Sequence, residues 1–336
     1  MPTLPMMTPT PHADASRKIT APGGYESWRF DASSDDGKLH LVAALHVGDP
    51  FDARYLRRYL RYRRRPTRVA PPQPADFCAV TFALVEKGRP ALRFTSAARA
   101  TPDDFYAGED GRTVRLGASH LNRGGDGAVR LHVRGTYHDR TISANLAFRP
   151  QIEANTEVAL AAEPLSAQVG EHGWVVVNPL CDVDGEISVI AAEAGGPPRV
   201  SPFAGVGAHD HSYGTRPMLE LSPRWLTGRA LFEDRAITFQ QVGETSFVCR
   251  SFADREVAPR VTRNGGLQIA DSGTSRWGIS YPSKAELPGD VRLLRPRVVA
   301  SKFASVTVAY DAVGELETGR ALVQVFKPRR LLWRWW

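Results

Sequence analysis

The stretch VRLHVRGTYHDRTISANLAF, residues 129–148, decides the fold class. Apolar residues alternate with polar ones over 129–133, and the alternation resumes over 142–148. Side chains of a β-strand point alternately to its two faces, so each run would bury one face and expose the other. His138, Asp139 and Arg140 between the runs fit a tight turn. The stretch therefore predicts an antiparallel hairpin.

Short apolar runs of the same kind recur along the chain. They are LHLVAALHV (39–47), FCAVTFALVEKG (77–88), WVVVNP (174–179), ISVIAAE (187–193), RALF (229–232), AITFQQVG (236–243), WGISYP (277–282), SVTVAYDA (305–312) and ALVQVFKP (321–328). Turn pairs such as Asp36-Gly37 and Asn264-Gly265 separate many of them. Short strands with frequent turns are typical of antiparallel sandwiches and barrels rather than parallel βαβ sheets. We therefore predict an all-β protein.

The chain of 336 residues is long enough for two domains. Residues 1–20 are rich in proline and threonine and are predicted to form a disordered leader. AEAGGPPRVSPFAG, at about 192–205, is the best linker candidate. The sequence therefore predicts an N-terminal β-domain over 21–195 and a C-terminal β-domain over 196–336. Each is large enough for an antiparallel barrel or sandwich.

One segment, DARYLRRYLRYRRRP (52–66), has the pattern of an amphipathic helix. Asp52 suits the N-cap, and three tyrosines spaced i, i+4, i+7 share a face opposite most of the arginines. The stretch from 54 to 68 holds eight arginines and no acid, more than the whole net charge of +7. Basicity this concentrated does not indicate a nucleic-acid-binding protein, and no nucleic-acid partner is predicted.

A basic amphipathic helix is typical of contact with an anionic membrane surface. The residues predicted to face the membrane are Arg57, Arg58, Arg61, Arg64, Trp333, Trp335 and Trp336. The alternative is a solvated arginine-rich segment and a tail packed on the body. No apolar run approaches the roughly 20 residues that span a bilayer, and no signal peptide is recognisable. We expect a cytoplasmic protein, with peripheral membrane contact as an open alternative.

Familiar catalytic and cofactor motifs are missing. The sequence has no P-loop, no GxSxG, no HExxH, no CxxC and no GxGxxG between a strand and a helix. Cys78, Cys181 and Cys249 are scattered and fit buried thiols. We therefore expect no cofactor, and an enzyme on this chain would use side chains alone or a metal ion.

The segment GAHDHSYG (207–214) is the main chemical candidate. On a strand, His209 and His211 would share one face and Asp210 would take the other. Two histidines could begin a metal site, with His40 or His46 as partners, although nothing in the spacing requires them. Asp210 could instead be an acid kept neutral by an apolar cavity, or the cap of a turn.

Several segments, in order, resemble the carotenoid 1,2-hydratases (hydroxyneurosporene synthases). They are GGYESWRFDASSDDG (23–37), HVGDPF (46–51), PADFCAVTFALVEKGRP (74–90), HGWVVVNPLCDVDGEISV (172–189), GVGAHDHSYGTRP (205–217) and RWLTGRALF (224–232). The resemblance implies two lipocalin-like β-domains in tandem. It also implies hydration of the terminal double bond of an acyclic carotenoid without a cofactor. Related members are described as dehydrating, isomerising or cyclising polyene and terpenoid substrates.

The resemblance also implies site residues. The family's catalytic aspartate falls on Asp210 and a cavity tryptophan on Trp225, while Tyr25, Trp28 and Asp31 match the opening motif. Tyr213 and Ala208 would share the substrate cavity, with His209 and His211 as auxiliary groups. Ala208 replaces a family tyrosine, Thr227 a common tryptophan, and Ser27 one aromatic of the opening motif.

The resulting hypothesis is acid catalysis on an alkene. A neutral Asp210 would protonate the double bond, Trp28 and Trp225 would stabilise the cation, and water would add. The returning Asp210 carboxylate or one of the two histidines would take the proton from water. The alternatives are a cyclase or isomerase on the same scaffold, a non-catalytic carrier of a hydrophobic pigment or lipid, and a factor that docks on a membrane complex. The sequence predicts a hydrophobic small-molecule partner and leaves the oligomeric state open.

Overall fold

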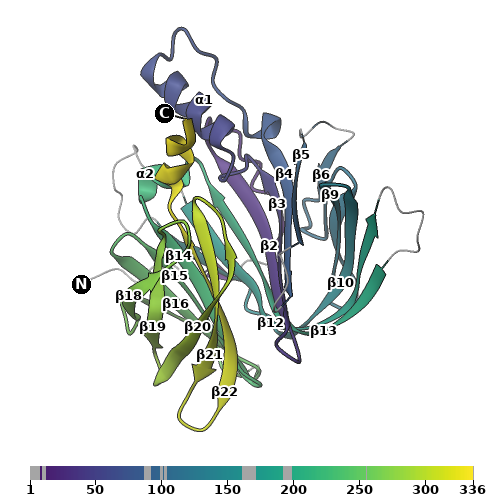
Figure 1. The fold of residues 1–336 in the computed structure, drawn as a ribbon, viewed down its shortest axis with the longest axis vertical. Helices are drawn as coiled ribbons and strands as arrows, with labels where there is room; N and C mark the ends of the chain where they lie inside the picture. The colour runs from purple at the N-terminus through teal and green to yellow at the C-terminus, as the bar shows by residue number, and fades with distance from the viewer. Residues whose placement is uncertain are drawn as a thin grey trace.

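The computed structural model describes residues 8–9, 13–86, 92–98, 101, 104–160, 172–191, 199–254 and 256–335. These residues form two curled antiparallel sheets side by side, with a few short helices at one end (Figure 1). The predicted all-β class is confirmed. Each sheet resembles a half-barrel rather than a closed one.

The first sheet has the order β5-β4-β3-β2-β13-β12-β10-β9-β8-β7-β6, with β11 on β12 and β1 on β11. Its strands are β1 (Thr8–Pro9), β2 (Tyr25–Ser34), β3 (Leu39–Val47), β4 (Cys78–Glu86), β5 (Leu92–Ala98), β6 (Phe105–Ala107), β7 (Thr113–Leu116), β8 (Ser119–Arg123), β9 (Val129–Tyr137), β10 (Arg140–Ile152), β11 (Thr156–Ala159), β12 (His172–Ala191) and β13 (Arg199–Gly214).

The second sheet has the order β17-β16-β15-β14-β22-β21-β20-β19-β18. Its strands are β14 (Trp225–Leu231), β15 (Arg235–Val242), β16 (Thr245–Phe252), β17 (Arg260–Arg263), β18 (Gln268–Thr274), β19 (Ser280–Leu287), β20 (Val291–Ser301), β21 (Ser305–Val313) and β22 (Thr318–Phe326). The helices are α1 (Ala53–Arg64), the short η1 (Pro74–Asp76), α2 (Met218–Leu221) and η2 (Pro328–Trp335).

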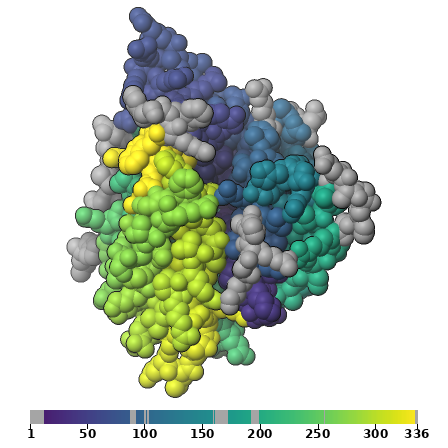
Figure 2. Space-filling view, viewed as in Figure 1, coloured from purple at the N-terminus to yellow at the C-terminus, as the bar shows by residue number. Residues whose placement is uncertain are grey.

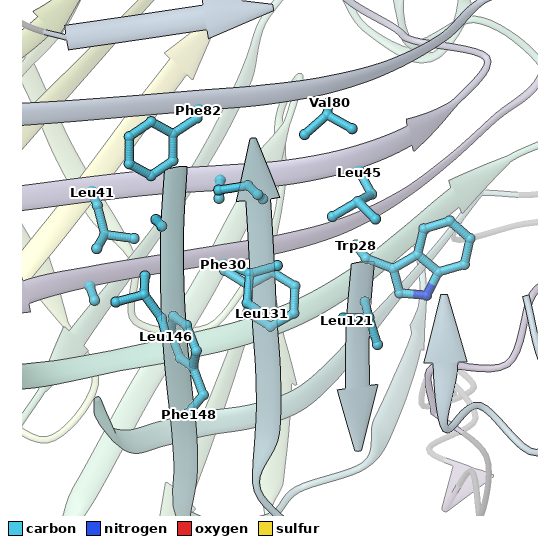
Figure 3. Close-up of a cluster of buried hydrophobic side chains, with 14 of the residues drawn as sticks. Trp28, Phe30, Leu41, Leu45, Val80, Phe82, Leu121, Leu131, Leu146 and Phe148 are labelled. Atoms are coloured by element: carbon cyan, nitrogen blue, oxygen red, sulfur yellow. The ribbon is translucent and has the colours of Figure 1, made fainter. Parts of the chain in front are cut away.

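The predicted hairpin is confirmed as β9 and β10. Leu131 pairs with Leu146 and Val133 with Ala144, so the apolar sets of both strands share one face. That face joins the core of the first sheet, together with Trp28 and other side chains shown in Figure 3. The core lies inside the curl of the sheet, which brings Phe94 of β5 against Gly135 of β9.

The change of sheet does not coincide with the predicted division at 195/196. Strand β13 (Arg199–Gly214) pairs with β12 and β2, so it belongs to the first sheet. The second sheet begins only at Trp225. Proline and glycine mark the linker candidate, but residues 199–205 of it are strand, and residues 192–198 lie outside the described residues. Independent folding of two domains stays a prediction.

The N-terminal leader is not uniformly disordered. Residues 1–7 and 10–12 lie outside the described residues, whereas residues 13–20 are placed against the first sheet. Ala13 and Asp14 are buried, and Trp28 donates its indole N–H to the Asp14 carbonyl oxygen (3.0 Å). The prediction from composition was wrong for this part because it did not account for partners far along the chain.

The predicted basic helix is confirmed as α1. Asp52 caps it by accepting a hydrogen bond from Arg54 N, and Tyr55, Leu56 and Tyr59 are buried. Tyr55 donates its hydroxyl hydrogen bond to the Gly24 carbonyl oxygen (2.7 Å). The apolar face of α1 therefore packs on the body and is not free to enter a bilayer, while the arginine-bearing segment projects from one end (Figure 2).

The C-terminal segment η2 lies next to α1. Trp333 is 61% exposed, while Trp336 and the side chain of Trp335 lie outside the described residues. Among the described residues, no helix is both long and apolar enough to cross a membrane. Cys78, Cys181 and Cys249 are buried thiols outside any disulfide, as predicted.

Candidate active site between the two sheets

Strands β13 and β2 place two different sets of side chains back to back. In their antiparallel register His209 lies opposite Phe30, Asp210 opposite Arg29 and His211 opposite Trp28. Residues directly opposite each other share a face. The predicted separation of the two histidines from Asp210 is therefore confirmed.

The histidine face holds the N-terminal segment. His211 Nε2 lies 2.9 Å from Glu26 Oε1, and its Nδ1 lies 2.8 Å from the Ala13 carbonyl oxygen. His209 Nε2 lies 2.6 Å from Asp14 Oδ1, and its Nδ1 lies 2.9 Å from the Arg29 carbonyl oxygen. All four ring nitrogens already face an acceptor. These histidines therefore serve as structural anchors in this fold.

The charges on this face stabilise one another. Burial opposes ionisation of His211, but the hydrogen bond and charge of Glu26 raise its pKa above the ordinary value. For Asp14, burial acts upward, but His209, Arg123 and His211 together bring the pKa well below the ordinary value. Trp28 stacks on His211 at 4.8 Å between ring centroids.

The Asp210 face carries a second buried charge cluster, which bridges the two sheets. Arg229 of β14 donates a hydrogen bond from Nη2 to Asp210 Oδ2 (2.7 Å). The same nitrogen lies 2.8 Å from Asp31 Oδ2, and Arg29 Nη2 lies 3.6 Å from that oxygen. The cluster thus contains two carboxylates and two guanidinium groups, which balance in charge. All four side chains are largely buried.

Burial and pairing compete inside this cluster. For Arg229 burial acts downward, but Asp31 and Asp210 raise its pKa overall. Burial lowers the pKa of Arg29 and raises that of Asp31. A guanidinium hydrogen bond favours the ionised carboxylate. Asp210 therefore does not lie in the purely apolar surrounding that the neutral-acid hypothesis required, and we correct that expectation.

Two adjoining cavities lie between the sheets beside this cluster. The smaller, about 80 Å³, is lined by Asp210, Tyr25 and Trp225 among others. The larger, about 320 Å³, extends between β3 and β4 on one side and β20 to β22 on the other. The residues common to both walls are Arg29, His46, Phe51, Gln324 and Phe326.

Three residues predicted from the sequence meet at the smaller cavity. Tyr25 and Asp210 come from the first sheet, and Trp225 comes from the second. Trp225 donates its indole N–H to the Met218 carbonyl oxygen (2.9 Å). Tyr25 Oη lies 3.3 Å from His172 Nδ1. Two sheets thus build one site.

Four other predicted residues do not line these cavities. Trp28 and Tyr213 lie on the histidine face, because their positions on β2 and β13 have the opposite parity to Arg29 and Asp210. Trp28 is fully buried in the core, and Tyr213 donates its hydroxyl to Glu157. Asp31 and Ala208 pair with each other on the Asp210 face, and Asp31 belongs to the charge cluster, but neither residue lines the two cavities. The predicted cavity role of Trp28 and Tyr213 was wrong.

The histidines weighed as metal partners also have other roles. His46 lines both cavities, and its Nδ1 lies 2.7 Å from Ser27 Oγ. His40 lines the larger cavity, and its Nδ1 lies 2.8 Å from Ser33 Oγ. Burial lowers the pKa of His46 to about 3 and, with nearby arginines, that of His40 to about 4. Both are neutral near pH 7.

Sequence reasoning missed the charged partners Arg29 and Arg229, and also Asp49 and Lys302 of the larger cavity. A signal was present for the arginines, because each interrupts an apolar strand, and a buried charge requires a partner. The partner itself could not be identified, since Arg229 and Asp31 meet only when the sheets pack.

Comparisons with known proteins agree with this fold. No family model matches the chain. A curated protein of Chlorobaculum tepidum, hydroxyneurosporene dehydrogenase, is 29% identical over 223 residues, which are 64% of this chain and 56% of that protein. The match thus spans little more than half the length of that relative. The sequence resemblance is confirmed at the level of a distant relative.

Solved structures extend the likeness to the whole fold. A protein described as AttH, from Nitrosomonas europaea, has a TM-score of 0.62 at 14% identity, over 94% of this chain and 95% of its own. CghA has a TM-score of 0.48 at 10% identity, over 91% of this chain and 88% of its own, which is too low to argue from. The first likeness supports the two-sheet fold and nothing finer.

Proposed function

We propose that this chain is a cofactor-independent enzyme that binds a polyene or terpenoid between its two sheets and adds water to a carbon–carbon double bond. The observation that carries the proposal is the meeting of Asp210, Tyr25 and Trp225 on one cavity wall. All three are residues at which the sequence resembles the carotenoid 1,2-hydratases. The curated relative is named hydroxyneurosporene dehydrogenase. Hydroxyneurosporene carries a hydroxyl group of the kind that hydration of a polyene would introduce.

The cavity walls suit a hydrophobic ligand with one reactive end. Phe51, Trp225 and Phe326 supply apolar surface around Asp210. Binding sites for small molecules are commonly apolar with a few placed polar groups. The Arg229 hydrogen bond holds Asp210 in one position, and a preorganised polar group stabilises a developing opposite charge without reorganisation.

The proposed reaction balances as follows. An acid of the cavity wall gives a proton to the less substituted alkene carbon, and the π electrons form the new C–H bond. The cation left on the more substituted carbon lies near the Trp225 ring and the Asp210 carboxylate. A water oxygen forms the C–O bond with a lone pair, and Asp210 accepts the proton that this water releases. The product is an alcohol one water heavier than the substrate.

Isotope labelling tests this chemistry. The purified protein is incubated with acyclic polyenes of the lycopene and neurosporene type in D2O, with heat-denatured protein as control. We expect a product that has gained one water and carries one deuterium bound to the carbon next to the new alcohol. A product two hydrogens lighter would indicate dehydrogenation, and no conversion of any polyene or terpenoid would contradict the proposal.

Two alternatives give different results in the same assay. A cyclase or isomerase would form a product that has gained no water and carries at most one deuterium in place of a hydrogen, because the cation, rearranged or cyclised by a substrate alkene, ends by losing a proton. A carrier would bind the polyene without converting it, and Asp210→Asn would leave the binding constant within about threefold. The assay therefore distinguishes a hydratase, a cyclase or isomerase, and a carrier.

We also propose that the arginine face of α1 contacts an anionic membrane surface, which would give a cytoplasmic protein access to a lipid-soluble substrate. Arg58, Arg61 and Arg64 are exposed, and Trp333 on the neighbouring η2 is exposed as well. Each basic residue near an anionic surface contributes about 1 kcal/mol. Because the tyrosine face is buried, the contact would be electrostatic rather than inserted.

Vesicle binding tests the membrane contact. We expect sedimentation with vesicles of phosphatidylcholine and phosphatidylserine, weaker binding at high salt, and none to phosphatidylcholine alone. The triple change of Arg58, Arg61 and Arg64 to Glu should abolish it. The matched control reverses three exposed arginines elsewhere, Arg112, Arg115 and Arg140. Equal loss in both variants would contradict a specific role for α1.

A further inference from the structure

The turn after β3 places a second carboxyl group on the cavity wall. Asp49 follows Gly48, whose φ of +68° and close approach to the Gly24 carbonyl oxygen exclude a side chain. The Asp49 N–H donates to the Phe77 carbonyl oxygen (2.6 Å), and Asp49 Oδ1 accepts from Phe51 N (2.9 Å). Asp49 is therefore held in one position by the backbone on both sides.

Asp49 differs from Asp210 in its surroundings. It is 5% exposed and lines the larger cavity, whose surface as a whole is more apolar than polar. Its nearest charged groups are Asp52 and Arg54 at the start of α1 and Lys302 in the turn after β20, and the neutral His46 and the cation Arg29 line the same cavity. Asp210 has a guanidinium hydrogen bond, whereas the hydrogen bond to Asp49 Oδ1 comes from an uncharged backbone N–H.

These surroundings favour the protonated acid. Burial raises the pKa of Asp49 to about 7, with a further upward contribution from Asp52, while the Phe51 N–H and Lys302 act in the opposite direction. Burial also lowers the pKa of Lys302, and nearby Arg93 adds to that effect. A carboxylic acid that titrates near neutrality is matched to proton donation at physiological pH.

We propose that Asp49 is the proton donor of the reaction in this cavity, an assignment that rests on the proposed function. The O–H bond of Asp49 breaks as its proton forms the C–H bond at the alkene, and its electron pair stays on the carboxylate. The Phe51 N–H and the Lys302 side chain stabilise that carboxylate. The proton released by water to Asp210 returns through solvent to Asp49, so neither group is consumed.

The division of labour follows from position. Asp49 lies on the wall of the larger cavity and Asp210 on that of the smaller, with Phe51 and His46 shared between them. An acid and an anion on adjoining walls of one site are what an alkene hydration requires, because proton donation and water deprotonation occur at neighbouring carbons.

The pH dependence of the wild-type enzyme gives the first test. We expect kcat/KM to be constant at acidic pH and to fall about tenfold per pH unit above pH 7, as the acid form of Asp49 is lost. Lys302→Met should move this fall to higher pH, because Asp49 loses a stabilising cation for its carboxylate. A rate that is flat or rising through pH 7 would overturn the assignment without any variant.

Asp49→Asn gives the second test. The amide oxygen keeps the acceptor for Phe51 N, so the turn is expected to fold, and binding of the polyene checks this. We expect kcat to fall at least ~100-fold and its decline above pH 7 to disappear. Asp52→Asn, which changes the neighbouring N-cap carboxylate in the same way, is the control and should remain within about threefold of wild type.

The outcomes separate the two proposals. If the wild-type protein hydrates a polyene and Asp49→Asn keeps its rate and its pH profile, the assignment of Asp49 is wrong and the hydratase function stands. If the wild-type protein converts no polyene or terpenoid, the proposed function is wrong, and the role of Asp49 is refuted with it.

Discussion

The two faces of β13 both carry buried pairs of acidic and basic side chains, but they differ in what lies next to those pairs. On one face His209 and His211 pair with Asp14 and Glu26, and the N-terminal segment covers them completely. On the other face Asp210 pairs with Arg229 across the gap between the sheets and borders a cavity. Both faces bury acidic side chains paired with basic ones, and the two cavities described above border the Asp210 face.

Residue type alone therefore does not distinguish a structural group from a candidate reactive group on this strand. A His-Asp-His sequence contains three groups with catalytic chemistry, yet strand parity divides it between an anchor and a site. On the histidine face, every ring nitrogen has an acceptor, so the pairs contribute to stability. On the Asp210 face, the paired carboxyl group borders a cavity. The presence of a cavity beside Asp210, and of the N-terminal segment over the histidines, is what distinguishes the two faces.

The largest effect should come from removing the cation that bridges the sheets. Arg229→Met would leave Asp31 and Asp210 buried with only Arg29 to compensate them. Loss of one partner from a buried ion pair typically costs about 3–5 kcal/mol. Urea unfolding should show that loss, and Asp31→Asn with Asp210→Asn in the same chain should recover part of it. Unfolding at the wild-type urea concentration would show that the cluster does not hold the sheets together.

Removing a histidine from the histidine face should lower the free energy of unfolding by a smaller amount and leave turnover unchanged. In His211→Phe, Glu26 keeps its hydrogen bonds from Ser16 Oγ and Arg17 N. A hydrogen bond to a charged group is worth about 1.5–3 kcal/mol, so we expect a loss of about 2–3 kcal/mol. Turnover per folded molecule should stay at the wild-type value. A fall in turnover larger than the fall in folded fraction would mean that the two faces are not independent.

Substitutions of Trp28, on the histidine face, and of Trp225, at the cavity, should have smaller effects that distinguish the two faces in the same way. Trp28→Phe removes a buried hydrogen bond and should cost about 1–2 kcal/mol without changing turnover. Trp225→Phe should lower turnover about fivefold, because a smaller ring stabilises a cation less well. It should also cost about 1–2 kcal/mol of stability, because it loses the indole N–H hydrogen bond to the Met218 carbonyl oxygen. Unfolding curves and kcat for both variants check the pattern. The reverse assignment would place the substrate on the histidine face.

The smallest effect is the pH dependence of stability. Asp14, whose pKa is lowered on folding, stabilises the fold above its unfolded value near 3.8, and that stability is lost as the pH falls toward its folded pKa. His211, whose pKa is raised on folding, stabilises the fold below 6.5, and that stability is lost as the pH rises through its folded pKa.

Denaturant unfolding at a series of pH values should show both declines, each on the order of 1 kcal/mol. Asp49 and Asp31 add to the decline above pH 3.8, because burial raises their pKa values, so the part that belongs to His211 is the difference between wild type and His211→Phe. We expect a smaller decline in His211→Phe. A decline of the wild-type size there would assign it to other groups.

Much of the fold could be predicted because it depends on local pattern. The alternation over 129–148 specified the β9–β10 hairpin, and the tyrosine spacing specified α1. Alternation also separated His209 from Asp210. The same parity rule, applied to β2, would have removed Trp28 from the cavity, since Trp28 and Arg29 must lie on opposite faces. The cavity position of Trp28 was implied by the family resemblance and not by the strand pattern.

The charge partners could not be predicted, because they depend on how distant segments pack. Arg229 reaches Asp210 across two sheets, and Asp14 reaches His209 from a segment that composition marks as disordered. The elevated pKa of Asp49 depends on burial that HVGDPF does not reveal. The change of sheet after β13 could not be predicted either, because proline and glycine also occur beside this strand, which belongs to the first sheet.

The central claim is that the Asp210 face of β13 is the reactive face, and one pair of matched variants tests it directly. Asp210→Asn and Asp14→Asn each remove one buried, paired carboxylate, on opposite faces of the same sheet. Turnover per folded molecule, measured as formation of the hydrated polyene, should fall at least ~100-fold in Asp210→Asn and stay at the wild-type value in Asp14→Asn. Equal turnover in the two variants would contradict the account.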